Sequence, residues 1–168
     1  MHNIVLTGLR GSGKTEIGKI LAKKLGWNFI DIDEEIEKTE KAKIAKIVEI
    51  RGWEYFRTVE NKVAKKVAEL YKTVIATGGG TILDHGNEKA LKKNGKIIYL
   101  HVKPAICAAR ILNDPNRPPL TNKKTVEEEI KQLYKKRNGR YCESANLIFE
   151  RTDDLKKDAI KILKKLSP

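Results

Sequence analysis

The sequence predicts an α/β fold in which helices cover both faces of a parallel sheet. Short strand-like runs alternate with longer segments of helical periodicity along almost the whole chain, which is the pattern that strand–helix–strand crossovers produce. A glycine-rich turn follows the first strand-like run directly. The length of 168 residues suits one core, so we expect a single domain over residues 1–168.

Five strand-like runs lie in order along the chain: Asn3–Thr7, Asn28–Ile32, Thr73–Ala76, Lys96–His101 and Leu147–Phe149. The segments between them carry apolar residues at helical spacing. These are Ile17, Ile20, Leu21 and Leu25, then Phe56, Val63, Val67 and Leu70, and finally Leu155, Ala159, Ile162 and Leu166. Glycine commonly follows the last residue of a helix, so we expect the first helix to end at Gly26.

Two segments break this alternation. About forty residues between the second and third runs are helical in pattern, more than one crossover needs, and we interpret residues 33–62 as an inserted helical subdomain. Residues 112–124 contain three of the five prolines, several polar residues and Arg117, a composition typical of a loop that closes over a site. We therefore predict a lid there. Ligands of such sheets collect beyond the carboxyl ends of the strands.

The charge balance is strongly basic, with 35 Lys and Arg against 22 Asp and Glu and a formal net charge of +13. The lysines are spread over nearly every helix-like stretch, and aromatic residues do not interleave them as a single-strand-binding face requires. We interpret the excess as solvated helix faces, as in heat-adapted proteins rich in Lys and Glu, and expect no nucleic-acid partner. The positive field would still attract a polyanionic substrate.

Cysteines and termini point to a cytoplasmic protein. Cys107 and Cys142 lack metal-ligand spacing, and we expect both to be reduced thiols. The first residues resemble a strand rather than a signal peptide, and no apolar run approaches the ~20 residues that span a bilayer. We expect a soluble protein without a membrane partner. Nothing in the sequence indicates an obligate dimer, so we expect a monomer.

A phosphate-binding motif follows the first strand-like run. Residues 8–15 (GLRGSGKT) match the P-loop pattern G-x-x-x-x-G-K-[ST], with a strand before the motif and a helix after it. In this motif the backbone N–H groups around Gly11, Ser12 and Gly13 would surround phosphate oxygens. Lys14 would reach the β- and γ-phosphates, and the Thr15 hydroxyl would bind Mg²⁺. The motif predicts binding of ATP with Mg²⁺ and leaves the acceptor open.

Two aspartates close the second strand-like run. In a strand, Asp31 and Asp33 would point to the same side. Beside Mg·ATP, one carboxylate could serve the metal while the other holds the acceptor hydroxyl and takes its proton. The third run leads into Gly78–Gly80 without the acidic residue that holds the metal in many P-loop NTPases, so Asp31 is the expected supplier. The alternative is helix capping, since Asp33 precedes a helix-like segment.

Three arginines are candidates for binding anionic groups. On a helix, Arg57 and Glu60 would be neighbours at i,i+3, so the carboxylate could orient the guanidinium as a clamp for a substrate carboxylate. The alternative is a plain surface ion pair. Arg117, in the predicted lid, could neutralise charge on a transferring phosphoryl group. Arg137 lies in a lysine-rich helix-like segment, where the alternative is a solvated cation.

Taken together, these residues resemble the shikimate kinase family across essentially the whole chain. That family combines a P-loop, a D-x-D at the end of strand two, an F-R-x-x-E on a helix, a G-G-G after strand three, an R-P-L lid and a late R-x-x-x-Y, and this sequence has them in the same order. The resemblance implies a nucleoside monophosphate kinase-like fold with a five-stranded parallel sheet. It also implies transfer of the ATP γ-phosphoryl to the 3-hydroxyl of shikimate, in aromatic amino acid biosynthesis.

The resemblance assigns roles by matching position. Lys14 and Arg117 would stabilise the transferring phosphoryl group, and Thr15 and Asp31 would serve Mg²⁺. Asp33 would bind the substrate hydroxyls and is the candidate base.

The same resemblance implies that Arg57, Gly79 and Arg137 complete the shikimate pocket, with the two arginines holding the carboxylate. Arg110 would lie near the adenine. The chain departs from the family at two places. Trp53 stands where Glu usually follows the glycine, and Pro119 turns the usual Arg-Pro-Leu-Leu into Arg-Pro-Pro-Leu.

Other functions stay open. Another small-molecule kinase, for gluconate or a nucleoside monophosphate, would share the scaffold, although two arginines facing a D-x-D suit a small hydroxylated carboxylate better. A nucleic-acid-binding P-loop module would need a basic face away from the ATP site and would bind with strong salt dependence. The intact Lys14, Asp31 and Arg117 argue against an inactive, ligand-sensing relative.

Overall fold

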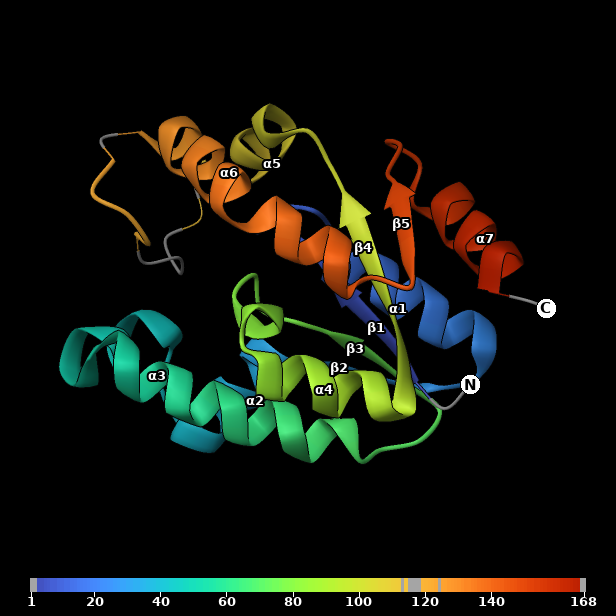
Figure 1. The fold of residues 1–168 in the computed structure, drawn as a ribbon, viewed down its shortest axis with the longest axis horizontal. Coiled ribbons are helices and arrows are strands. Elements are labelled where there is room, and N and C mark those ends of the chain that lie inside the picture. Colours follow the sequence, from blue (N-terminus) through green and yellow to red (C-terminus); the bar gives the residue numbers. More distant parts are fainter. Residues whose placement is uncertain (1–2, 113, 115–118, 124, 167–168) are drawn as a thin grey trace.

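The computed structural model of the chain describes residues 3–112, 114, 119–123 and 125–166. It confirms the predicted α/β architecture (Figure 1). Its strands are β1 (Asn3–Thr7), β2 (Asn28–Asp31), β3 (Thr73–Ala76), β4 (Gly95–His101) and β5 (Leu147–Glu150). Within the described residues these form one sheet in the order β2-β3-β1-β4-β5, and every pair of neighbours is parallel. The strand that leads into the P-loop is therefore the central one.

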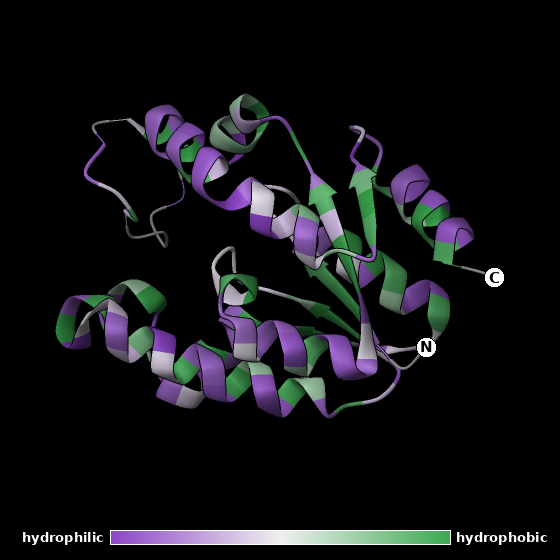
Figure 2. Cartoon of the chain, in the orientation of Figure 1, coloured by the Kyte–Doolittle hydropathy of each residue, from purple (hydrophilic) through white to green (hydrophobic). Residues whose placement is uncertain are grey.

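Helices cover both faces of the sheet. They are α1 (Lys14–Leu25), α2 (Ile32–Glu40), α3 (Ile44–Ala68), α4 (His85–Asn94), α5 (Pro104–Ile111), α6 (Val126–Ser144) and α7 (Leu155–Leu166), with a short 3₁₀ turn, η1 (Thr81–Leu83). Neighbouring strand residues point to opposite faces, so Ile4 and Leu6 pack with α1 and α7, whereas Val5 packs with the helices from α2 to α6. Figure 2 shows hydrophobic strands surrounded by helices with many hydrophilic residues.

The chain between β2 and β3 is helical, as the sequence indicated. It consists of α2 and α3, and α3 is broken at Gly52, where φ is 80° and ψ is 168°. Three expected strand boundaries are wrong by one residue: β2 ends at Asp31, because Ile32 already begins α2, β4 begins at Gly95 and β5 ends at Glu150. Leu70, expected on the apolar stripe of this helix, lies beyond its end and is exposed.

Other expectations can be compared with the same structure. The first helix ends at Gly26, whose φ of 65° is left-handed, as predicted. Cys107 and Cys142 are free thiols, and Cys107 is buried. The described residues of the predicted lid, 112, 114 and 119–123, belong to no helix or strand. Among the helices of the described ranges, none combines the length and apolarity that crossing a bilayer requires.

Candidate active site

A cavity of about 660 Å³ lies beyond the carboxyl ends of β1, β2 and β3. It brings together most of the residues that the sequence singled out: Gly11, Gly13, Lys14, Thr15, Asp31, Asp33, Arg57, Gly79, Arg110 and Arg137. Ser12 is buried inside the P-loop itself. Arg117 lies outside the described residues.

The P-loop curls between β1 and α1 because its glycines adopt conformations that other residues resist. Gly8, Gly11 and Gly13 have φ values of 144°, 80° and 81°, and Gly13 stands at the N-terminal boundary of α1. A Cβ on Gly11 would lie 2.6 Å from the carbonyl oxygen of Cys107. The Lys14 ammonium donates to the carbonyl oxygens of Gly8 (3.0 Å) and Leu9 (2.8 Å), so it lies across the loop. The loop and the start of α1 form an anion-binding cradle.

Asp31 joins the end of β2 to the P-loop. Its Oδ2 accepts a hydrogen bond of 2.7 Å from the Thr15 hydroxyl, and its Oδ1 accepts from the backbone N–H of Asp33 at 3.0 Å. Asp31 is thus the N-cap of α2. A hydroxyl and a carboxylate in contact beside a phosphate cradle are oxygen donors of the kind that Mg²⁺ prefers, so these two residues fit the predicted metal.

Asp33 reaches the cavity by a different route from the one predicted. It lies in the first turn of α2, not in a strand, so strand alternation does not explain its direction. The cap is Asp31 rather than Asp33. Both aspartates nevertheless line the cavity, because the helix begins immediately after Asp31 and turns Asp33 inward. Asp33 Oδ1 would lie 2.7 Å from a Cβ placed on Gly78.

The glycine run after β3 makes room for a polar cluster. A Cβ on Gly78 would also lie 2.9 Å from Glu60 Oε1, and one on Gly80 would lie 2.6 Å from the Arg57 guanidinium. Side chains at these positions would push apart the groups that the cavity brings together. Gly78 and Gly80 therefore serve close packing of side chains against the backbone.

Arg57 is held in place by Glu60, as the spacing predicted. Arg57 Nη1 lies 2.6 Å from Glu60 Oε2, and the other oxygen of Glu60 accepts a 2.7 Å hydrogen bond from Thr81. Glu60 is only 1% exposed, whereas the Arg57 side chain is 36% exposed. Trp53 and Phe56 lie beside the Arg57 guanidinium, with ring centroids 5.7 and 5.2 Å from its Cζ. The guanidinium is therefore oriented on one side and accessible on the other.

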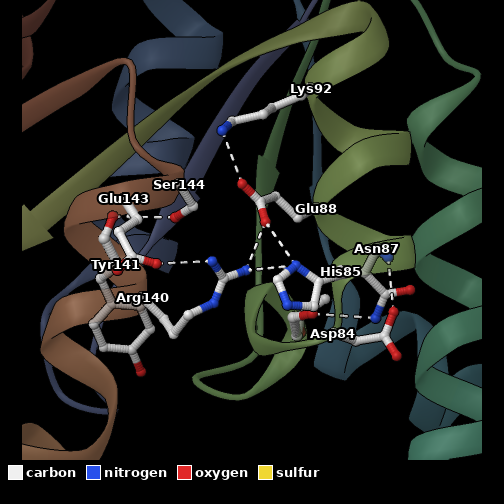
Figure 3. A network of polar contacts seen from close by, with 10 residues as sticks. Asp84, His85, Asn87, Glu88, Lys92, Arg140, Tyr141, Glu143 and Ser144 are labelled. Carbon is white, nitrogen blue, oxygen red and sulfur yellow. Dashed lines mark hydrogen bonds and ion pairs between the residues drawn. The ribbon is translucent and has the colours of Figure 1, made fainter.

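Helix α6 brings a second arginine to the same glycine run. Arg137 Nη1 donates to the Gly79 carbonyl oxygen at 3.2 Å, and the Tyr141 hydroxyl donates to the same oxygen. Burial raises the pKa of Tyr141, which keeps its hydroxyl a donor. The last turns of α6 are joined to α4 by Arg140, whose Nη2 lies 2.6 Å from Glu88 Oε2 (Figure 3).

Sequence reasoning missed Arg151, which follows β5, contacts the P-loop and lines the cavity. Its Nη1 donates to the Ser12 carbonyl oxygen at 2.7 Å, and its Nε lies 3.4 Å from the buried Asp158. Burial and the nearby charge of Arg110 lower the pKa of the Arg151 guanidinium. Arg110 itself donates to the Gly11 carbonyl oxygen at 3.3 Å. No motif marks Arg151, because its partner in the P-loop, Ser12, is 139 positions away in the sequence.

Fold and site together define a class of protein. A P-loop at the end of the central strand of a parallel sheet, sharing one cavity with carboxylates and arginines, is the arrangement of a P-loop kinase. The chain belongs to the shikimate kinase family, whose sequence profile, described as shikimate kinase, matches residues 10–167.

Curated relatives agree with this membership. The chain is 40% identical over 148 residues to shikimate kinase 2 of Photorhabdus laumondii subsp. laumondii, which covers 86% of this chain and 84% of that protein. It is 43% identical over 141 residues to shikimate kinase of Thermodesulfovibrio yellowstonii, covering 84% and 81%.

Solved structures give the same result. Shikimate kinase from Acinetobacter baumannii in complex with shikimate matches with a TM-score of 0.95 at 36% identity, covering 99% of this chain and 93% of that chain. A gluconokinase from Sinorhizobium meliloti matches with a TM-score of 0.53 at 16% identity, covering 98% and 93%, so this likeness concerns the fold alone.

Proposed function

We propose that this protein transfers the γ-phosphoryl group of ATP to the 3-hydroxyl of shikimate. One observation carries the proposal: the Asp33 carboxylate and the Arg57 guanidinium line the same cavity as the P-loop residues Lys14 and Thr15. An anionic, hydroxylated acceptor needs a cation for its carboxylate and a base for its hydroxyl, and both stand beside the phosphate cradle. The shikimate-bound relative from Acinetobacter baumannii supports this choice of acceptor.

The acceptor would bind between α3, the glycine run and α6. Arg57, fixed by Glu60, would form charged hydrogen bonds with the substrate carboxylate, and Arg137 would add a second cation from α6. Asp33 would accept a hydrogen bond from the ring hydroxyl that reacts. Binding by these groups would hold the hydroxyl in line with the phosphate cradle, and such positioning is a large part of catalysis in phosphoryl transfer.

In the reaction the substrate oxygen bonds to the γ-phosphorus while the bond from that phosphorus to the β–γ bridging oxygen breaks, which releases ADP. Asp33 takes the hydroxyl proton. Lys14 offsets the negative charge on the phosphoryl oxygens. Thr15 and Asp31 would hold Mg²⁺, which neutralises phosphate charge when bound. Arg117, from the predicted lid, would act on the same phosphoryl group, as its sequence position and the family resemblance both suggest.

The nucleotide would lie along the P-loop with its base toward α5 and the turn after β5. Arg110 lines this end of the cavity and contacts Gly11, so we propose that it lies near the adenine. We further propose that the protein acts in the cytoplasm, since its two free thiols suit a reducing compartment, and that it is a monomer.

The proposal is tested with the purified protein, Mg·ATP and a panel of acceptors: shikimate, gluconate and nucleoside monophosphates. Of these acceptors, we expect only shikimate to give release of ADP. The phosphorus NMR signal of the product should couple to the proton on ring carbon 3. Turnover on gluconate or a nucleoside monophosphate without turnover on shikimate would reject the assignment. Light scattering of the same sample tests the monomer.

A further inference from the structure

A buried carboxylate on α6 connects two segments that line the cavity. Glu129 lies in the first turn of α6, and its side chain is only 9% exposed. Its Oε1 lies 3.3 Å from Arg10 Nη1, in the P-loop. Its Oε2 accepts hydrogen bonds from the backbone N–H groups of Leu120 at 2.9 Å and Thr121 at 3.2 Å. One side chain therefore joins α6, the phosphate-binding loop and the chain that immediately precedes α6.

Both connected segments belong to the region where phosphoryl transfer is proposed. Arg10 stands between Gly8 and Gly11, and the side chains of Arg10 and Leu120 line the cavity. The backbone nitrogen of Arg10 also lies close to the glycine run after β3, 3.6 Å from a Cβ placed on Gly79. Leu120 packs against the main apolar core as well.

The chemistry of the contact requires a carboxylate. Donors face both oxygens of Glu129, namely a guanidinium on one and two consecutive backbone N–H groups on the other. A glutamine of the same shape has one acceptor oxygen and one NH₂ group, so its NH₂ would have to face a donor on one side. Because the site is buried, water cannot easily replace the lost acceptor. Aspartate keeps the charge but is one methylene shorter.

We propose that Glu129 is a positioning residue for phosphoryl transfer, which holds Arg10 of the P-loop and the Leu120–Thr121 backbone in one fixed arrangement. This inference rests on the proposed function and extends it to a residue that does not line the cavity itself. The proposed shikimate-binding groups Arg57 and Arg137 contact Glu60 and Gly79 instead. Loss of Glu129 should therefore change the rate of transfer more than the binding of the acceptor.

The test is a kinetic comparison of Glu129→Gln with the unaltered enzyme. We expect kcat to fall about tenfold or more, as displaced reacting groups produce, with the KM for shikimate within about twofold. Glu128→Gln is the matched control. Glu128 is the exposed neighbour of Glu129 on the same helix, and its substitution removes the same charge. It should keep both constants. Arg10→Gln should also lower kcat, and the double variant should lose less than the product of the two single losses.

A second measurement does not depend on turnover. Hydrogen exchange by NMR should show faster exchange of the Leu120 and Thr121 amides in Glu129→Gln and unchanged rates in Glu128→Gln. If Glu129→Gln fails to fold, Glu129→Asp and Arg10→Gln answer the same question. An unchanged kcat, or full protection of both amides in the variant, overturns the inference.

Failure of the proposed function gives a different result. If the unaltered enzyme turns over gluconate or a nucleoside monophosphate instead of shikimate, the kcat comparison is made with that acceptor. A tenfold loss there supports the positioning role of Glu129 although the acceptor was misassigned.

Discussion

Thr15 Oγ1 donates a 2.7 Å hydrogen bond to Asp31 Oδ2, which joins the first turn of α1 directly to the last residue of β2. The other oxygen of Asp31 caps α2 through the N–H of Asp33. One carboxylate therefore holds the proposed metal-binding hydroxyl with one oxygen and fixes the start of the helix that carries the proposed base with the other. The two parts of the site are positioned by the same residue.

This double role predicts a selective defect in Asp31→Asn. Asparagine caps helices as well as aspartate does, so the melting temperature should change little. Loss of the negative charge should raise the Mg²⁺ concentration for half-maximal activity about tenfold, since Mg²⁺ favours carboxylate oxygens. Titration of activity with MgCl₂ measures this. Asp84→Asn is the control, because Asp84 also caps a helix, α4, and the substitution should leave the Mg²⁺ dependence unaltered.

Asp33→Asn should separate chemistry from nucleotide binding. The amide cannot accept the hydroxyl proton, so we expect kcat to fall by about a hundredfold or more. The proposed nucleotide contacts are made by the P-loop, so the Kd for ADP, measured by calorimetry, should stay within about twofold. A similar loss in both quantities would show that Asp33 has a structural role instead.

Arg57→Ala should weaken acceptor binding specifically. A buried substrate carboxylate would lose a charged partner, so the KM for shikimate should rise about tenfold or more while the KM for ATP stays unchanged. Glu60→Gln should cause a smaller rise, because Arg57 would keep its charge but lose its orienting partner. Arg51→Ala, an exposed arginine of the same helix that packs over the Tyr55 ring, is the control. An unaltered KM in Arg57→Ala would remove this residue from the pocket.

The Glu88 carboxylate should make stability depend on pH in the acid range. Burial acts to raise its pKa, but hydrogen bonds from Lys92 and Arg140 outweigh burial, so the pKa of Glu88 lies below its ordinary value of 4.5. A carboxyl group whose pKa is lowered by folding stabilises the folded state at any pH above its ordinary pKa. That stabilisation is lost as the pH falls through the lowered pKa of the folded state. The contacts of Glu88 with Lys92 and Arg140 therefore stabilise the fold at neutral pH.

We accordingly expect Glu88→Gln to lower the free energy of unfolding by about 1–2 kcal/mol at pH 7. The difference from the unaltered protein should shrink as the pH falls below 4.5. Urea unfolding at several pH values measures both. Lys92→Met is the control, because it removes the partner within α4 and keeps the Arg140 contact between helices. It should cost less than Glu88→Gln, and an equal cost would mean that the contact between α4 and α6 adds nothing.

Local patterns along the chain were enough to predict the scaffold and the nucleotide cradle. The P-loop, the spacing of Arg57 and Glu60 and the glycine that ends α1 all depend on residues within eight positions of each other. Their geometry follows from backbone sterics and helix periodicity, which tertiary context rarely overrides. The five strands were predicted for the same reason, with boundaries that differ by at most one residue.

The direction of Asp33 and the contacts of Glu129, Arg140 and Arg151 could not be obtained in this way. The direction of the Asp33 side chain depends on the helix that begins at Ile32, and the sequence pattern predicted a strand residue there instead. Arg10 and Glu129 are 119 positions apart, and Arg151 and Ser12 are 139 apart. Such contacts exist only after the strands have paired and α6 and β5 have packed against the rest. A charged residue can pair with many partners. Its neighbours in the sequence do not determine which of these partners lies beside it in the folded protein.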